Sequence, residues 1–355
     1  MGRNHLTAFT QALLAALLFG VSTPLAKLLL GGVDPIPLAA FLYLGSGISL
    51  LLVKHLLSRR KKSTTTEAPL QKPDLKWLAG AIILGGVAAP ITLLFSLKNT
   101  PAATSSLLLN FEGVATTLIA VLIFKEALSR RAWGAVGLVT VAGILLTVNF
   151  NAGWGFSPGS LGIIAACIFW GLDNNFTRNI SSKDPLTIVS LKGLGAGSVS
   201  LILALILKSP LPQPGIVAGA MVLGSLSYGM SIVLFILAMR GMGAARTSAL
   251  FGTAPLVGMI VSLLIVKDSL NPMLFIAAPL MVAGARLLID EEHQHYHVHA
   301  EMTHEHAHSH PDEHHAHVHV GEFQGRHSHP HVHSSLAHQH QHLPDIHHRH
   351  GHSAE

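Results

Sequence analysis

The chain has 355 residues, of which 50% are hydrophobic and only 12% charged, against roughly 25% charged residues in soluble domains. This composition excludes an ordinary soluble enzyme or nucleic-acid-binding protein and indicates an integral membrane protein. The formal charge of +5 hides two regions: residues 1–290 hold 21 Lys/Arg and 9 Asp/Glu, whereas residues 291–355 hold 2 and 9. We explain the basic charge by membrane topology and expect no nucleic-acid partner. The single cysteine, Cys167, excludes an intramolecular disulfide.

Apolar segments long enough for the bilayer fill the first 290 residues. A hydrocarbon core of about 30 Å requires about 20 helical residues. Turn signals such as Gly31-Gly32, Ser157-Pro158-Gly159 and Asn271-Pro272 separate the segments. We predict ten spans, at 7–30, 36–57, 77–97, 102–124, 132–149, 158–179, 186–207, 215–239, 244–266 and 270–289.

Lysine and arginine indicate the orientation of these spans. With the N-terminus inside, fifteen of them fall in inner loops and four, Lys27, Lys98, Lys208 and Lys267, at the outer ends. Such a bias follows the positive-inside rule. We therefore expect a multi-pass protein of the cytoplasmic membrane with both termini in the cytoplasm.

The two halves of the membrane part resemble each other. Matched positions lie 151 to 141 residues apart: Phe19-Gly20 with Trp170-Gly171, Asp34-Pro35 with Asp184-Pro185, Lys125-Glu126 with Lys267-Asp268, and Val141-Ala142-Gly143 with Val282-Ala283-Gly284. Five spans per unit is an odd number, so the second copy must be inverted in the membrane. Inverted repeats are typical of secondary transporters, which place the substrate site near the midplane between the halves.

On these residues the chain resembles the EamA-type members of the drug/metabolite transporter superfamily. The likeness rests on Phe19-Gly20, Trp170-Gly171 and the acidic span ends Glu126 and Asp268. The second copy departs from the family pattern at Asp268, where a glutamate is usual. It implies an all-α membrane protein of ten helices in two inverted five-helix repeats, at 7–149 and 158–290, followed by a disordered tail at 291–355. It also implies transport without catalysis or a required cofactor. The family carries many unrelated metabolites, so the substrate stays open.

Glu112 is the most central ionisable residue, midway along the fourth predicted span beside Asn110. Charges in hydrocarbon cost several kcal/mol and mark pathways or proton relays. Its counterpart in the second half is Ala254. The functional interpretation is a proton- or cation-coupling carboxylate facing a transport cavity, and the structural one is a protonated or lysine-paired carboxyl.

The sixth and seventh predicted spans add further polar residues, Asp173, Asn174, Asn175 and Lys192. Three consecutive side chains cannot share one face of a helix with 3.6 residues per turn. At most two of the run can line a pathway, and the others must bond neighbouring helices. Lys192 either extends to the inner surface or forms an ion pair with Asp173 or Glu112.

The tail holds 23 of the 25 histidines. They alternate with small, acidic and amide residues, and the segment cannot build a core, so we expect it to be disordered without metal. Neutral imidazoles suit Zn, Ni and Co. We expect metal ligands at His295, His297, His299, His304, His306, His308, His310, His317, His319, His329, His331 and His333.

Two functions remain. The first is a secondary transporter that moves a small organic metabolite by alternating access, which we expect to be coupled to protons, with a metal-binding tail. The alternative is a divalent-metal exporter whose tail collects cargo. The spans contain no motif of a hydrolase, metalloprotease or phosphate loop. The sequence does not decide transport direction, coupling ion or whether the chain forms a homodimer.

Overall fold

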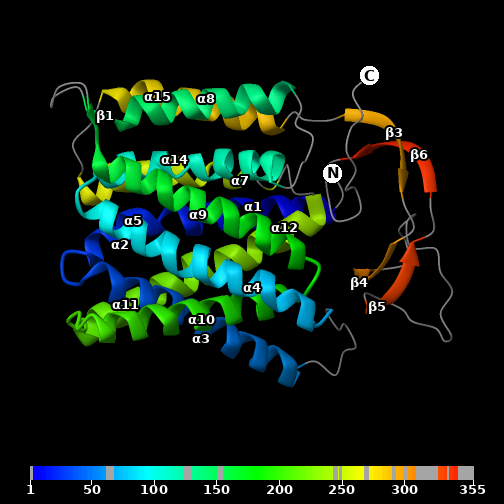
Figure 1. Cartoon of the computed structure of the whole chain (residues 1–355), viewed down its shortest axis with the longest axis horizontal. Helices are drawn as coiled ribbons and strands as arrows, with labels where there is room; N and C mark the ends of the chain where they lie inside the picture. Colours follow the sequence, from blue (N-terminus) through cyan, green and yellow to red (C-terminus); the bar gives the residue numbers. More distant parts are fainter. Residues whose placement is uncertain are drawn as a thin grey trace.

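The computed structural model describes residues 3–60, 68–123, 130–149, 155–242, 247, 250–267 and 272–289, and four strands between residues 293 and 342. Its long helices run side by side as one bundle (Figure 1). The N-terminus and the tail strands lie at the same end of this bundle. An even number of spans produces this arrangement.

The elements follow the repeat. The first half contains α1 (Arg3–Gly20), α2 (Ser22–Leu29), α3 (Pro35–Arg60), the 3-10 turn η1 (Lys72–Asp74), α4 (Leu75–Ala81), the π-helix η2 (Ile82–Ala88), α5 (Ala89–Lys98), α6 (Ala102–Leu108), α7 (Phe111–Leu122) and α8 (Arg130–Thr147). The second contains α9 (Pro158–Ile180), α10 (Pro185–Ile206), α11 (Pro214–Leu223), the π-helix η4 (Gly224–Met230), α12 (Ser231–Met242), α14 (Ala254–Val261), the π-helix η5 (Ser262–Val266) and α15 (Met273–Ile289). The short strands β1 (Val148–Asn149) and β2 (Gly155–Phe156) pair between the halves.

These elements make ten spans. Spans 1 to 5 are α1–α2, α3, α4–η2–α5, α6–α7 and α8, and spans 6 to 10 are α9, α10, α11–η4–α12, α14–η5 and α15. Within the described ranges, six helices are long and apolar enough to cross a membrane, and three more are shorter apolar helices. The remaining span, α9, has 23 residues, and its polar residues 173–175 lower its hydropathy. The predicted ten-helix fold is confirmed.

Capping residues explain where spans 6 and 7 begin. The Ser157 hydroxyl accepts from the backbone N–H of Ser160, and the Asp184 carboxylate accepts from that of Leu186 at 3.0 Å. A proline at the first helical position follows each cap. Serine and aspartate satisfy N–H groups that a helix start leaves unpaired, and proline tolerates that position. The Asp-Pro and Ser-Pro pairs thus fix these starts.

Backbone irregularities recur at matched positions of the two halves. The π-helices η2 and η4 begin at Ile82 and Gly224 and end at Ala88 and Met230, both 142 positions apart. Span 4 is broken between α6 and α7, and span 9 is broken just before α14. Interrupted helices near the midplane are a feature of inverted-repeat transporters, because freed backbone groups there can line a site.

Glycine contacts show the same symmetry. A Cβ on Gly47 would lie 2.5 Å from the backbone nitrogen of Leu194, and one on Gly197 would lie 2.6 Å from that of Leu44. Gly197 lies 150 positions after Gly47, and Leu194 lies 150 positions after Leu44. The two contacts are therefore related by the repeat, and α3 and α10 cross at the pseudo-two-fold axis. Glycine permits this approach because a side chain would occupy the partner's backbone.

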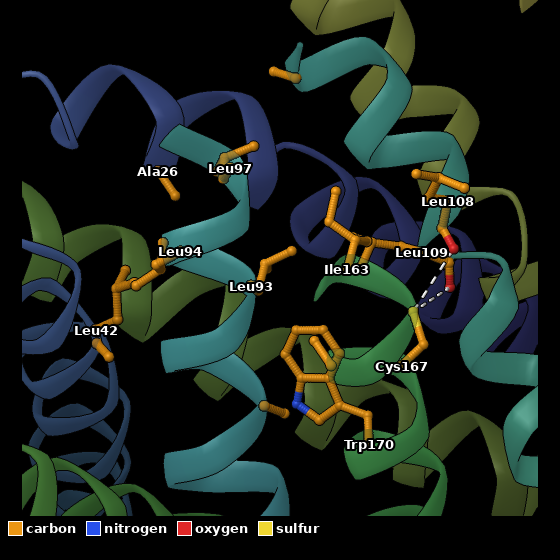
Figure 2. Packing of buried hydrophobic residues seen from close by; sticks show 14 of the residues in the cluster. Ala26, Leu42, Leu93, Leu94, Leu97, Leu108, Leu109, Ile163, Cys167 and Trp170 are labelled. Carbon is orange, nitrogen blue, oxygen red and sulfur yellow. Dashed lines mark hydrogen bonds between the residues drawn. The ribbon is translucent and has the colours of Figure 1, made fainter. Parts of the chain in front are cut away.

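Apolar side chains of α5 and α9 form much of the core (Figure 2). Leu93, Leu97, Ile163 and Cys167 are each at most 1% exposed. The Cys167 thiol faces the backbone oxygen of Leu108 at 3.7 Å. Cys167 is therefore a small core residue, as the sequence suggested.

The structure describes four segments of the tail, and the expectation that the tail is disordered without metal stays a prediction. These segments form strands: β3 (His293–His299), β4 (Met302–His308), β5 (His327–His333) and β6 (Leu336–His342). β3 pairs with β6 and β4 with β5, both antiparallel. The physical reason is the two-residue alternation, which suits an extended backbone whose N–H and C=O groups bond a partner strand. His310, His317 and His319 lie outside the described residues.

Candidate functional site

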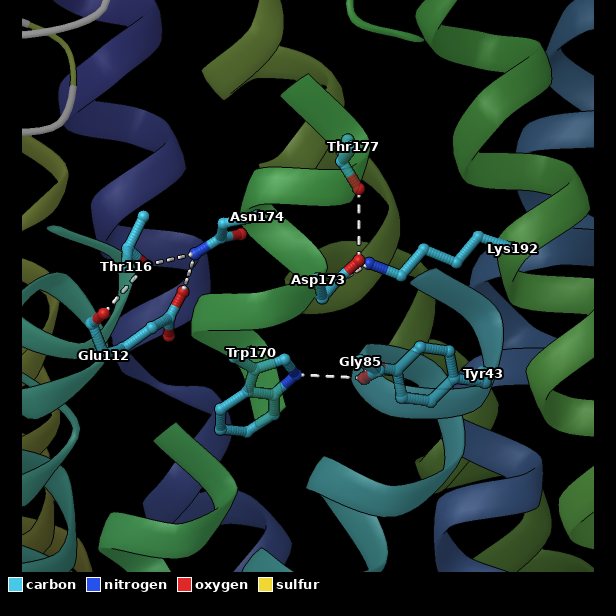
Figure 3. Close-up of polar contacts among 9 residues, drawn as sticks. All are labelled: Tyr43, Gly85, Glu112, Thr116, Trp170, Asp173, Asn174, Thr177 and Lys192. Atoms are coloured by element: carbon cyan, nitrogen blue, oxygen red, sulfur yellow. Dashed lines mark hydrogen bonds and ion pairs between the residues drawn. The ribbon is translucent and has the colours of Figure 1, made fainter. Parts of the chain in front are cut away.

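The three polar residues of α9 bond different groups. The Asn174 side chain extends to side chains of α7, and the Asp173 side chain extends to Lys192 of α10 (Figure 3). The Asn175 amide donates to the backbone oxygens of Thr116 at 3.1 Å and Gly171 at 2.8 Å. Asn175 therefore joins α7 to α9, in agreement with the geometric limit on three adjacent side chains.

Glu112 lies in the first turn of α7. The Asn174 amide donates to its Oε1 at 2.8 Å and to the Thr116 hydroxyl at 3.1 Å. The Thr116 hydroxyl itself donates to the backbone oxygen of Glu112 at 2.8 Å. The Glu112 residue is half-buried, and none of the described basic side chains forms an ion pair with it.

Asp173 has a different partner. Its Oδ2 forms an ion pair with the Lys192 ammonium, and its Oδ1 accepts from the Thr177 hydroxyl at 3.1 Å. The two charged side chains are 4% and 18% exposed. The sequence left two interpretations of Lys192, extension to the inner surface or an ion pair. In the structure Lys192 forms an ion pair, and its partner is Asp173. A charge that is paired and hydrogen-bonded in this way can remain buried.

Gly85 makes room for this ion pair. A Cβ at Gly85 would overlap the carboxylate of Asp173. The backbone oxygen of Gly85, inside the π-helix η2, accepts from the Tyr43 hydroxyl at 2.8 Å and from the Trp170 indole N–H at 3.0 Å. π-helical turns recur at functional sites because they displace the regular backbone bonds. One carbonyl oxygen thus links α3, η2 and α9 beside Asp173.

The structure does not bring Asn110 into this cluster. Asn110 occupies the turn between α6 and α7, and its amide donates to the Met281 sulfur of α15 at 3.3 Å. Conversely, sequence reasoning did not select Tyr43, Gly85 or Trp170 as site residues. The pair Gly85-Gly86 inside an apolar span was the available signal, since glycine in a helix often marks a close approach.

The spans offer little to a metal ion. Among the residues whose side chains are described, no group of three or more His, Cys, Asp or Glu is close enough to hold one. Lys192 already neutralises Asp173, so Glu112 and Asp173 do not form a free pair of carboxylate ligands. The arrangement instead provides one half-buried carboxylate without a counter-ion among the described residues, with the hydrogen-bonding groups of Asn174 and Thr116 beside it.

Comparisons with known proteins agree with this architecture. A transporter from Methanothermobacter thermautotrophicus, itself uncharacterized, is 28% identical over 304 residues, covering 80% of this chain and 87% of that protein. A crystal structure with 21% sequence identity and a TM-score of 0.58 covers 81% of this chain and 95% of its own, which shows the fold. The model of the EamA-like transporter family matches twice, at residues 6–149 and 157–289. The chain belongs to the EamA-like transporter family.

Proposed function

We propose that this transporter moves a small organic metabolite across the cytoplasmic membrane by alternating access and couples the movement to protons at Glu112. The observation that carries the proposal is the position of Glu112, half-buried within span 4, hydrogen-bonded to Asn174 and without an ion pair among the described residues. Both termini lie in the cytoplasm in this proposal, which the excess of inner Lys/Arg supports.

The division of charge at the site supports proton coupling. Lys192 neutralises Asp173, and the Asn174 amide leaves the charge of Glu112 unbalanced. An ionised carboxylate in hydrocarbon costs several kcal/mol, so Glu112 is stable in the membrane when a proton or a cation neutralises it. Exchange of a proton for substrate at one carboxylate would couple the two fluxes.

A divalent-metal exporter is the second candidate, and the 23 tail histidines are the observation in its favour. We propose that the tail binds Zn, Ni or Co on the cytoplasmic side. The ion pair at Asp173 and the lack of a described ligand cluster in the spans favour an organic cargo over a metal cargo. In the first candidate the tail buffers or senses metal.

Flux from proteoliposomes tests the proposal. The vesicles are loaded with a mixture of amino acids, amines, organic acids and the chlorides of Zn, Ni and Co, and a pH gradient is imposed. Mass spectrometry then identifies the compounds lost faster than from protein-free vesicles. The full chain and a chain ending at Asp290 are compared.

Glu112→Gln removes the charge and keeps the size of the side chain. We expect this variant to lose pH-driven flux while the folded protein remains in the membrane. Asp34→Asn is the matched control, because it removes a carboxylate outside the spans, and it should keep the flux. Unchanged pH-driven flux in Glu112→Gln would exclude the coupling role. Metal flux by both chain lengths would establish the second candidate.

A further inference from the structure

Lys27 joins the first span to the third. It lies in the last turn of α2, and its ammonium donates to the backbone oxygens of Leu97, in α5, and of Thr100, just after α5 ends. The last carbonyl groups of a helix have no partner within the helix, and a cation satisfies them and matches the negative end of the helix dipole. The contact bridges 70 positions of the chain and holds the end of α2 against the end of α5.

This contact lies at the end of the bundle opposite to the N-terminus and the tail (Figure 1). We call this end the far end, and the other the tail end. The side chains around the contact are enclosed: Ala26 is 1% exposed, Thr100 is 3% exposed, and Leu97 and Ala102 are 0% exposed. Spans 1, 3 and 4 are therefore packed closely against one another at the far end.

Matched positions of the two halves differ in exposure. In an inverted repeat they lie toward opposite ends of the bundle. Thr23 is 2% exposed, whereas Asn174, 151 positions later, is exposed, and Leu108 is fully buried, whereas Leu250, 142 positions later, is half-buried. An exposed amide is costly against lipid chains, so Asn174 indicates an approach for water from the tail end. The structure is thus closed at the far end and accessible from the tail end.

Opening of the far end requires the Lys27 contact to break. In inverted-repeat transporters one repeat rocks against the other, which closes one side of the site as it opens the other. Span 1 can bend at this level, because its helix is interrupted at Val21, between α1 and α2, and Pro24 offers no N–H to the carbonyl of Gly20. When α2 moves away from α5, Lys27 loses both carbonyl partners.

We propose that Lys27 is the gate residue of the far end. Its bonds to Leu97 and Thr100 stabilise the state that is open toward the tail end, and they break in the state that is open toward the far end. A lysine that only anchors a helix at the membrane surface extends its ammonium into water, whereas this one bonds the backbone of another span. The second half also carries a cation at the matched position, Arg178. The inference rests on the alternating access of the proposed function and adds a residue that sets the balance between the two states.

Cysteine labelling from each side of the membrane tests the gate. In the full chain with Cys167→Ala, which removes the one native thiol, Thr23→Cys reports on the far side and Asn174→Cys on the tail side. A membrane-impermeant maleimide is applied to intact cells and to inverted membrane vesicles, and the labelling rates are measured by mass spectrometry. Protease cleavage of the tail shows which side carries it, so the test does not depend on the predicted orientation.

Asn174→Cys should react from the tail side, and Thr23→Cys should react slowly from both sides. Lys27→Met keeps the apolar stem and removes the ammonium. It should accelerate labelling of Thr23→Cys from the far side at least about tenfold, because the lost bonds have a charged donor and stabilise only one state. Lys27→Arg should restore slow labelling, since a guanidinium also donates to carbonyl oxygens. Lys208→Met is the matched control, because it removes an exposed lysine that follows α10 at the same end, and it should leave the rate unchanged.

An unchanged far-side rate in Lys27→Met, or an equal acceleration in Lys208→Met, would overturn the gate. Acceleration from both sides would also overturn it, because it would show a loosened bundle and not one opened end. Labelling of Asn174→Cys from the far side alone would contradict the assigned state. These rates need no cargo, so failure of the proposed organic or proton-coupled flux would leave a positive labelling result standing, and a failed gate would leave the flux result standing.

Discussion

The two five-span halves share a backbone plan and differ in their polar side chains. The π-helices η2 and η4 lie at matched positions, and the glycines that bring α3 and α10 together are symmetry mates. At the site, however, Glu112 corresponds to Ala254, Asp173 to Ser22 and Lys192 to Leu42. A symmetric scaffold can adopt two mirrored access states. The comparison thus separates residues that form the scaffold from the charged residues for which we propose a role in transport.

The largest expected effect comes from breaking the charged pair. Lys192→Ala leaves the Asp173 carboxylate, which is 4% exposed, without its counter-ion, and such a loss costs about 3–5 kcal/mol. The double variant Asp173→Ser with Lys192→Leu gives these positions the residues of the first half and leaves no unpaired charge. We expect its thermal unfolding temperature in detergent to lie nearer the wild type than that of Lys192→Ala.

Transport provides the second readout of this pair. If the charges of Asp173 and Lys192 serve the site and not the scaffold, the double variant Asp173→Ser with Lys192→Leu should fold but lose transport flux. Equal destabilisation of the single and double variants would show that the cost of burying an unpaired carboxylate is not the dominant effect.

A smaller effect is expected from the symmetry-related glycines. Gly47→Ala and Gly197→Ala each place a Cβ within 2.6 Å of a backbone nitrogen on the opposite helix, so the helices must separate. Overpacking of this kind costs about 1–3 kcal/mol, and the two variants should lower the unfolding temperature by similar amounts. Gly215→Ala is the control, because a Cβ there meets nothing within 4 Å. Clearly unequal losses would argue against the two-fold relation at this contact.

The smallest effect concerns Asp184 and its mate Asp34, which precede the matched helices α10 and α3. Burial raises the pKa of Asp184, but hydrogen bonds from Lys54 and Thr187 outweigh it and hold the pKa below the ordinary value. Because the folded-state pKa is lowered, the stabilisation is present above the unfolded pKa and is lost as pH falls through the folded pKa. Asp34 is 43% exposed and pairs with Lys98 at 3.3 Å.

Asp184→Asn should therefore cost about 1 kcal/mol at neutral pH, since asparagine keeps the helix cap but loses the ion pair. The cost should shrink below about pH 4, where the wild-type carboxyl becomes protonated. Asp34→Asn should change stability by less than about 1 kcal/mol, as exposed ion pairs do. Unfolding temperatures from pH 7 to 3 check both. A constant difference between Asp184→Asn and the wild type across this range would contradict the assignment.

Particular residues show how far sequence reasoning extends. Polar residues within apolar spans led us to Glu112, Asp173, Asn174 and Lys192. The structure bonds Asn174 to Glu112 and pairs Lys192 with Asp173, and the role of these residues in transport stays a prediction. Asn110 was grouped with Glu112 because it is close in the chain, but the break between α6 and α7 directs it to Met281. Gly85 was not selected, because a glycine pair in an apolar span indicates a close approach but does not say which side chain approaches.

The sequence by itself determined the ten spans, the two matched halves and the alternation of histidine in the tail, because hydropathy, residue spacing and internal similarity are properties of the chain order. Only the tertiary structure decided the partners. Asn174 meets Glu112 across 62 positions and Trp170 meets the Gly85 carbonyl across 85. Such contacts depend on which helices pack together and on where π-turns shift their faces. The same holds for the tail, where only strand pairing decides which residues lie opposite each other along the backbone.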